Sequence, residues 1–339
     1  MVLALAFPTG AALAALAAVA LASAVFAGVY HAEVVAHRVG EPFGTLVLAV
    51  AVTVIEVALI VSVMVGDPVG KAGVARDTVF AAVMIVCNGI VGFCLLAGGM
   101  RHRVQGFQLE GASAALAVLA ALTVLTLVLP NVTMSAPGPV FTTPQLVFAA
   151  TGSLILYGAF VFVQTVRHRD FFLPVEGGNE DAHAEPPSAR TTLVSAVLLL
   201  VALLAVVGLA KALTPMLEAG LAALNAPKSI VGIVIAALVL TPEGLAAVRA
   251  ARANRLQTSL NLALGSALAT IGLTIPAVAI MSIAIAQPLV LGLGPKEMVL
   301  LALTLVLGII TLGTGRTTAL QGIVHLIVFA AFLSFALMP

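Results

Sequence analysis

Two glutamates, Glu56 and Glu243, stand alone inside long apolar stretches, one in each half of the chain. A carboxylate near the centre of a bilayer costs about 2.5 to 3.5 kcal/mol on insertion scales, so such a residue usually faces a polar cavity or an ion path. Burial disfavours the charged form of a carboxyl group, and a second carboxyl group nearby disfavours it further. Protons therefore compete with metal cations for such a pair, and the two groups are expected to titrate jointly. The two residues predict one shared site for a cation or for protons.

Polar residues also line one face of each helix that is expected to follow a glutamate. When Asp77 is aligned with Ser259, Asn88 aligns with Thr270, and the spacing keeps each set on one helix face. The two faces consist of Asp77, Asn88 and the small Gly92, and of Ser259, Ser266, Thr270 and Thr274. Hydroxyl and amide oxygens suit hard cations, although such groups also hydrogen-bond between membrane helices. We predict that the cation and proton site includes, beside the two glutamates, Thr53, Asn88, Ser266 and Thr270.

Other polar or special residues near these helices have their own interpretations. Asp77, at a predicted helix start, either caps the helix and interacts with its dipole or lies at the entrance to the site. Pro242, directly before the second glutamate, removes a backbone donor and is expected to disturb the helix and free carbonyls to line the site. His325 is expected to be packed or hydrogen-bonded within the last span. Cys87 and Cys94 form neither a disulfide framework nor a metal motif, so we interpret them as packing residues.

The elements that position these residues are membrane-spanning helices. Of the 339 residues, 62% are hydrophobic and only 9% are charged, which excludes a water-soluble globular protein. Apolar runs long enough to cross a bilayer as helices recur along the chain, and the alternation of a membrane β-barrel is absent. The fold class is therefore an all-α polytopic membrane protein with about ten spans. They are predicted near residues 9–30, 43–65, 77–99, 111–130, 145–166, 191–213, 228–249, 257–283, 296–313 and 317–338.

A polar segment divides these spans into five and five. The predicted units are a first half at 1–166, a cytoplasmic acidic linker at 167–190 and a second half at 191–339. Five is odd, so similar halves lie inverted in the membrane, an arrangement that many secondary transporters use around a central site. The linker lacks the spacing of an EF-hand calcium loop and is interpreted as a solvated segment rather than a cation sensor. The first apolar run lacks a basic start and exceeds a signal-peptide core, so it is expected to remain as a span.

Basic residues are distributed unequally between the two sides of the predicted bundle. One side has Arg38, Arg101, Arg103, Arg167, Arg169, Arg190, Arg249, Arg252, Arg255 and Arg316, and the other has Lys71, Arg76, Lys211, Lys228 and Lys296. The richer side is predicted to be cytoplasmic, which places both termini outside. The net charge of +1 gives no indication of a nucleic-acid partner, and no nucleic-acid motif is present.

Several segments carry a recognisable pattern: His37 to Thr45, Val52 to Val57, Ala75 to Thr78, Leu240 to Leu245, Asn261-Leu262 with Gly265 to Thr270, and Thr314 to Thr318 with Gly322 and His325. These segments resemble the bacterial ChaA-type calcium/proton antiporters of the cation/proton exchanger family. The resemblance covers nearly the whole chain from about residue 30. It implies the calcium/cation antiporter fold of two inverted five-helix halves, with Glu56 and Glu243 at the family's two essential acidic positions. The Gly-Asn-Ala-x-Glu signature of the wider family appears here as Val-Thr-Val-Ile-Glu and Leu-Thr-Pro-Glu, so its Asn ligands have no counterpart.

Together, the residues and the resemblance predict a secondary transporter that exchanges Ca²⁺ for protons across the inner membrane. Exchange of Na⁺ or K⁺ for protons at the same glutamates is the alternative within transport, and a passive cation channel is the alternative of another class. An enzyme is not expected, because neither a His-Glu-x-x-His metal motif nor a nucleophile with its base is found. The expected partners are membrane lipid, inorganic cations and protons, with no cofactor.

Overall fold

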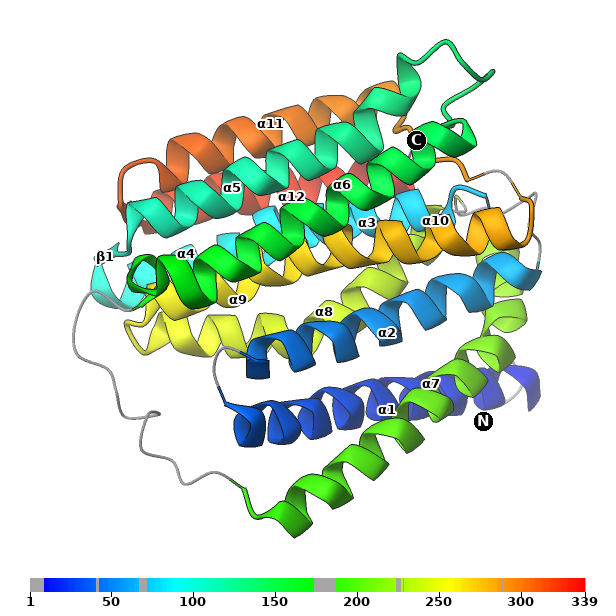
Figure 1. The fold of residues 1–339 in the computed structure, drawn as a ribbon, viewed down its shortest axis with the longest axis horizontal. Coiled ribbons are helices and arrows are strands. Elements are labelled where there is room, and N and C mark those ends of the chain that lie inside the picture. Colours follow the sequence, from blue (N-terminus) through cyan, green and yellow to red (C-terminus); the bar gives the residue numbers. More distant parts are fainter. Residues whose placement is uncertain are drawn as a thin grey trace, which may run out of the picture.

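The protein is a bundle of long, roughly aligned apolar helices (Figure 1). The computed structural model describes residues 9–40, 43–66, 72–173, 187–223, 227, 229–287 and 289–338. Within these ranges, 9 helices are long and apolar enough to cross a membrane, and Val47–Val61 adds a shorter apolar helix. The predicted all-α membrane fold with about ten spans is confirmed. Most of the linker, residues 174–186, lies outside the described part, as do Lys71 and Lys228.

The helices follow the predicted order along the chain. The first five spans are α1 (Thr9–Val39), α2 (Phe43–Gly66), α3 (Val74–Met84) continued by η1 (Ile85–Ile90) and α4 (Val91–His102), α5 (Leu109–Thr123) continued by η2 (Val124–Val128) and η3 (Leu129–Asn131), and α6 (Thr143–Phe162) continued by η4 (Val163–Arg167). The second five are α7 (Ala189–Ala223), α8 (Ser229–Arg252), α9 (Leu256–Ala269) continued by η7 (Thr270–Thr274) and α10 (Ile275–Ala284), α11 (Pro295–Leu312), and α12 (Ala319–Leu337). The short elements are η5 (Arg169–Phe172), β1 (Val104–Gly106) and β2 (Arg316–Thr318).

The first span of each half is longer than predicted. Helix α1 extends to Val39 and α7 to Ala223, although their apolar runs end near residues 30 and 213. Helix α7 even continues through Pro215. Helices α1 and α7 pack along each other, and both lie at a distance from α11 and α12 (Figure 1). Polar residues near these ends therefore lie on helix, where the hydropathy pattern alone indicates a loop.

Two loop pairings reveal the inverted relation between the halves. Strand β1, between the third and fourth spans, pairs antiparallel with β2, between the ninth and tenth. A separate bridge joins Val140, between the fourth and fifth spans, to Val290, between the eighth and ninth. The loop between the third and fourth spans corresponds to the loop between the eighth and ninth, and the loop between the fourth and fifth corresponds to the loop between the ninth and tenth. Each pairing therefore corresponds to the other when the halves are exchanged, and the two pairings lie at opposite ends of the bundle. The two halves are therefore inverted repeats, as the fold class predicted.

The fifth helix of each half also begins in the same way. The backbone N–H of Thr142 donates to Gln145 Oε1 at 3.0 Å at the start of α6, and Thr318 donates to Gln321 Oε1 at 2.9 Å at the start of α12. Both are capping boxes, which satisfy the unpaired backbone donors of a helix start. The repeated Thr-x-x-Gln pattern is a local trace of the internal duplication.

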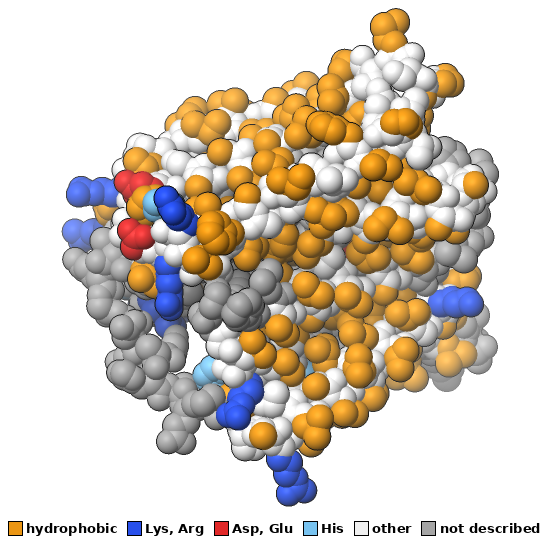
Figure 2. All heavy atoms as spheres, viewed as in Figure 1, with side chains coloured by type: hydrophobic (Ala, Val, Ile, Leu, Met, Phe, Trp, Pro, Cys, Tyr) orange, Lys and Arg blue, Asp and Glu red, His pale blue; other side chains and the backbone are white. Residues whose placement is uncertain are grey.

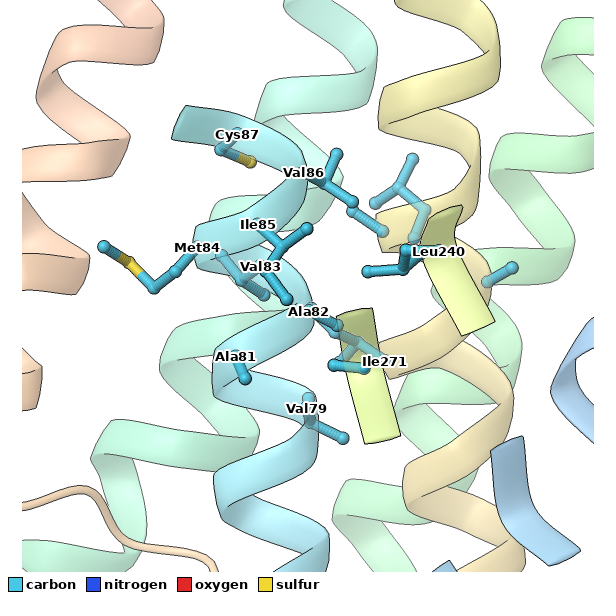
Figure 3. Packing of buried hydrophobic residues seen from close by; sticks show 14 of the residues in the cluster. Val79, Ala81, Ala82, Val83, Met84, Ile85, Val86, Cys87, Leu240 and Ile271 are labelled. Atoms are coloured by element: carbon cyan, nitrogen blue, oxygen red, sulfur yellow. The ribbon is translucent and has the colours of Figure 1, made fainter. Parts of the chain in front are cut away.

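The third span of each half forms the centre of the bundle. In the most apolar window of α3–η1–α4, 83% of residues are buried, and in that of α9–η7–α10 67%, whereas other candidate spans reach at most 44%. Figure 3 shows residues of α3 and η1 packed with Leu240 of α8 and Ile271 of η7. The remaining spans surround this centre and expose apolar side chains outward, as lipid requires (Figure 2). Both central spans contain a π-helical turn, a feature often found at functional sites.

Arginine-bearing loops meet at one end of the bundle. His102 Nε2 lies 3.0 Å from the Arg252 carbonyl, and Gln105 Nε2 donates to the Ala251 carbonyl at 2.9 Å. Arg316 begins β2, which pairs with β1 at the same end. Figure 2 shows most of the visible Lys and Arg side chains toward the left, where β1 lies in Figure 1. We call this the arginine end.

Candidate functional site

Glu56 lies in the middle of α2 and is almost fully buried, with 2% of its surface exposed. Thr274 of η7 donates a hydrogen bond to its Oε2 at 3.1 Å, and the Thr270 hydroxyl also hydrogen-bonds the carboxylate. Both hydroxyls come from the π-helical turn of the second half. A carboxylate of the first half is therefore held by the central helix of the second.

Glu243 lies on α8 and is partly exposed. The Ser266 hydroxyl of α9 donates to Glu243 Oε2. Helix α8 runs from Ser229 to Arg252 and continues through Pro242, so the proline does not end the helix. The exposed Thr241 hydroxyl donates to the Ala237 carbonyl at 2.5 Å, within its own helix.

One polar helix face therefore holds both carboxylates. Ser266, Thr270 and Thr274 are spaced by four residues each along α9–η7, so they lie on the same side. The two carboxylates interact electrostatically with each other, which places the residues predicted to share a site in the same region. Ser259, the fourth member of this face, is fully buried and interacts with the Cys94 side chain of α4 instead of with a carboxylate.

A cavity of about 80 Å³ lies between α2, α6, α8 and α9. Its polar lining includes Thr53, Tyr157, Gln164, Glu243, Asn261, Ser266 and Thr270. Gln164 is close in sequence to Arg167 and Asn261 to Arg255, so the cavity extends from Glu243 toward the arginine end. Thr53 donates its hydroxyl hydrogen to the Ala49 carbonyl at 2.8 Å, so its oxygen can only accept at the cavity. Glu56 does not line this cavity and lies deeper in the protein.

The structure places Asn88 away from the carboxylates. Its amide nitrogen donates to Thr304 Oγ1 at 2.8 Å, and its Oδ1 lies 3.1 Å from His325 Nδ1. The polar face of α3–η1–α4 therefore turns toward α11 and α12, because helical spacing fixes which residues share a face but not the direction of that face. The hydrogen-bonded role expected for His325 is observed.

Asp77 lies at the end of the bundle opposite the arginine end. It is in the first turn of α3, and it accepts from Arg76 Nε at 2.8 Å and pairs with Arg76 Nη2 at 2.7 Å. The cap position of α3 is Gly73, without a side-chain bond, so Asp77 is not the capping residue. A second cavity, of about 40 Å³, is lined by Asp77, Lys296 and Glu297 among others. This cavity also contacts α8 and α12, the inverted counterparts of α2 and α6 at the first cavity.

Glu33 is an acidic residue that the sequence pattern did not single out. It lies on α1 and acts electrostatically on Glu243, although its side chain is largely exposed. The predicted first span ended at residue 30, which placed Glu33 in a loop. A carboxylate that follows the end of an apolar run within about one helical turn is the signal that identifies such a residue.

Neutral oxygens complete the set of available ligands. Within the described ranges, no group of three or more His, Cys, Asp or Glu side chains lies close enough to hold a metal ion. Both cysteines are free and buried, as expected of packing residues. A cation at this site would be bound by two carboxylates and by hydroxyl oxygens.

Known proteins resemble the chain over most of its length. The family model "Sodium/calcium exchanger protein" matches residues 9–166 and 194–338. A protein named "Putative ionic transporter y4hA" from Sinorhizobium fredii is 54% identical over 323 residues, covering 94% of this chain and 87% of that protein. The "Sodium-potassium/proton antiporter ChaA" of Escherichia coli is 39% identical over 322 residues, with the same coverage of 94% and 87%.

A solved structure shares the fold. The crystal structure of the H⁺/Ca²⁺ exchanger CAX superposes with a TM-score of 0.70, covering 97% of this chain and 82% of that chain. The sequence identity is 17%, so this similarity concerns the fold alone.

Proposed function

Because the chain belongs to the sodium/calcium exchanger family, we propose that it is a proton-coupled cation antiporter in which Glu56 and Glu243 bind the cation or protons in turn. The observation that carries this proposal is the single polar face of α9–η7 that binds both carboxylates. Each half supplies one carboxylate. A movement of one half against the other would change the surroundings of both groups together.

The charge of the pair supplies the coupling. Two ionised carboxylates in a site without a compensating charge are strongly disfavoured, so the site holds either cation charge or protons. When the cation leaves, protons take its place. If the empty and charged pair cannot reorient across the membrane, the exchange is obligatory.

We assign Ca²⁺ as the first candidate cation. Calcium binds about six to eight oxygen ligands at roughly 2.3 to 2.6 Å. Two carboxylates provide up to four oxygens, and the hydroxyls of Ser266, Thr270 and Thr274 provide three more on the same face. A divalent ion also balances the charge of both carboxylates, and Thr53 offers a further oxygen at the cavity. Asn88 is not part of this ligand set.

Exchange of Na⁺ or K⁺ for protons is the second candidate. Its support is the antiporter of 39% identity, which is named for sodium and potassium. A single monovalent ion leaves one carboxylate charge unbalanced. This version of the proposal therefore requires a retained proton or a second cation at the site.

The cavity suggests the route and the orientation. By the excess of arginine, the arginine end faces the cytoplasm, which places both termini outside a bacterial inner membrane. The cavity at Glu243 then serves as the cytoplasmic access route, and Asp77 lies at the external entrance. The units of exchange are the halves 1–166 and 191–339, joined by the segment 167–190.

Proteoliposomes with a preset pH gradient test the proposal. Addition of Ca²⁺, Na⁺ and K⁺ in separate experiments should collapse the gradient with at least one of them, and empty liposomes provide the baseline. A passive cation channel would instead carry current along the cation gradient without moving protons. If no cation collapses the gradient, the antiporter proposal fails.

A further inference from the structure

A buried chain of polar groups joins η1, α11 and α12. It is separate from the carboxylates of Glu56 and Glu243. Its members are Asn88, Thr304, Thr311 and His325, exposed by 0%, 1%, 3% and 1%. Polar groups inside a membrane protein must find partners within the protein, because lipid offers none.

Along this chain of polar groups, the hydrogen bonds all donate in one direction. Thr304 has one hydroxyl hydrogen, which it donates to the Leu300 carbonyl at 2.7 Å, so its oxygen accepts from Asn88 Nδ2. The Asn88 Oδ1 therefore faces His325 Nδ1 at 3.1 Å, which makes this nitrogen the donor. In a neutral ring the other nitrogen, Nε2, then accepts from the Thr311 hydroxyl at 3.0 Å.

His325 also satisfies a backbone group that the π-helical turn leaves free. At the end of η1, the Val91 N–H bonds to the Val86 carbonyl rather than to that of Cys87. The Cys87 carbonyl consequently lacks its usual partner four residues ahead. The His325 ring also hydrogen-bonds the backbone of Cys87 and so completes the turn, with its single N–H shared between this carbonyl and the Asn88 Oδ1. The same ring thus binds both a side chain and the backbone of η1.

The turn that this chain fixes packs directly beside the proposed cation site. Ile90, the last residue of η1, contacts Gly244 of α8, where an added Cβ would lie 3.0 Å from Ile90 Cδ1. Gly244 follows Glu243 in the sequence. Leu240, one turn earlier on α8, belongs to the same packed cluster (Figure 3). A shift of η1 would therefore move the backbone that carries Glu243.

The inverted counterpart of η1 acts differently. In the alignment of the halves, Asn88 corresponds to Thr270, which hydrogen-bonds Glu56 itself. The π-helical turn of the second half binds a carboxylate, whereas that of the first half is bound by His325. We propose that His325 is a positioning residue for the exchange, which holds η1 against α8 and thereby fixes the geometry of Glu243. This inference rests on the proposed function of the Glu56 and Glu243 pair.

Transport kinetics with matched variants test the proposal. His325→Leu removes all ring bonds at similar volume, His325→Gln keeps a donor and an acceptor, and Thr311→Val removes one bond without changing size. Thr126→Val is the control, because Thr126 is equally buried and, among the described residues, its side chain bonds only the Leu122 carbonyl of its own helix. His325→Leu should raise the cation KM about tenfold with little change in maximal rate, and His325→Gln should restore most of the affinity. Thr311→Val should lie between them.

A second readout does not depend on transport. Alkylation of Cys87 by N-ethylmaleimide should be faster in His325→Leu and Thr311→Val than in the wild type, because η1 loosens, whereas Cys94 should react slowly throughout. Unchanged KM together with unchanged Cys87 labelling in both variants overturns the positioning role, and so does a fall in maximal rate alone. Should the wild type exchange no cation, the proposed function fails, and the Cys87 rates then decide whether His325 holds η1. If His325→Leu does not fold, Thr311→Val and His325→Gln decide both readouts.

Discussion

Thr274 donates a 3.1 Å hydrogen bond to Glu56, from the π-helical turn of one half to the second helix of the other. The hydroxyl of Thr274 donates its hydrogen to the carboxylate, and the lone pairs of its oxygen are available to bind a cation. This contact therefore links the proposed cation site to the junction of the inverted halves. It also provides the first variant that should change cation affinity without removing a carboxylate.

Thr274→Val should raise the cation KM about tenfold, because it removes a hydrogen bond to a charged group and one oxygen ligand while keeping the side-chain volume. Initial rates of cation-driven proton movement over a range of cation concentrations give this value. Thr126→Val is the matched control and should behave as the wild type. Equal KM values in the two variants would exclude Thr274 from the site.

Acidic pH should weaken cation binding. In the proposed site, protons and cations compete for the same two carboxylates, so the apparent KM for the cation should rise as pH falls on the binding side. Exchange measured in proteoliposomes at several pH values, with the opposite side held constant, checks this. A KM that does not depend on pH would show that cation and protons use separate sites.

Gln164 and Asn261 should be reachable from the arginine end. In a background with Cys87→Ala and Cys94→Ala, we expect Gln164→Cys and Asn261→Cys to react with a membrane-impermeant thiol reagent added on that side. The cation should slow the reaction, because the cavity leads to Glu243. Reaction only from the opposite side would reverse the assigned access route.

Glu33 should contribute to cation attraction rather than to binding. Its exposed carboxylate acts electrostatically on Glu243 from α1, so Glu33→Gln should raise the KM by about two- to fivefold at low ionic strength and less in high salt. Glu110→Gln is the control, because Glu110 is an exposed carboxylate near the same end. A loss that is independent of salt would point instead to a direct ligand.

The sequence predicted the helices and the carboxylate pair because both leave strong local signals. Long apolar runs define spans, and an isolated Glu56 or Glu243 within one is conspicuous. The family expected from the quoted motifs is confirmed by the family model and by ChaA. The face of Ser266, Thr270 and Thr274 also followed from spacing, because the period of an α-helix is fixed.

Other features depend on tertiary packing and could not be derived in the same way. The direction in which Asn88 points is set by the packing of η1 against α11 and α12, and the π-helical turn itself has no distinct composition. Pro242 predicts a disturbed helix, and the packing around α8 keeps the helix continuous through this residue. Glu33 was missed because α1 extends beyond its apolar run.

The central claim is most directly tested by cation-driven collapse of a pH gradient in proteoliposomes that contain Glu56→Gln or Glu243→Gln. Glutamine keeps the size and one acceptor oxygen but has no titratable carboxyl group, so each variant should insert normally and exchange no cation above the level of empty liposomes. Thr126→Val, reconstituted in the same amount, should exchange as the wild type does. Near-normal exchange by either glutamine variant would contradict the shared carboxylate site.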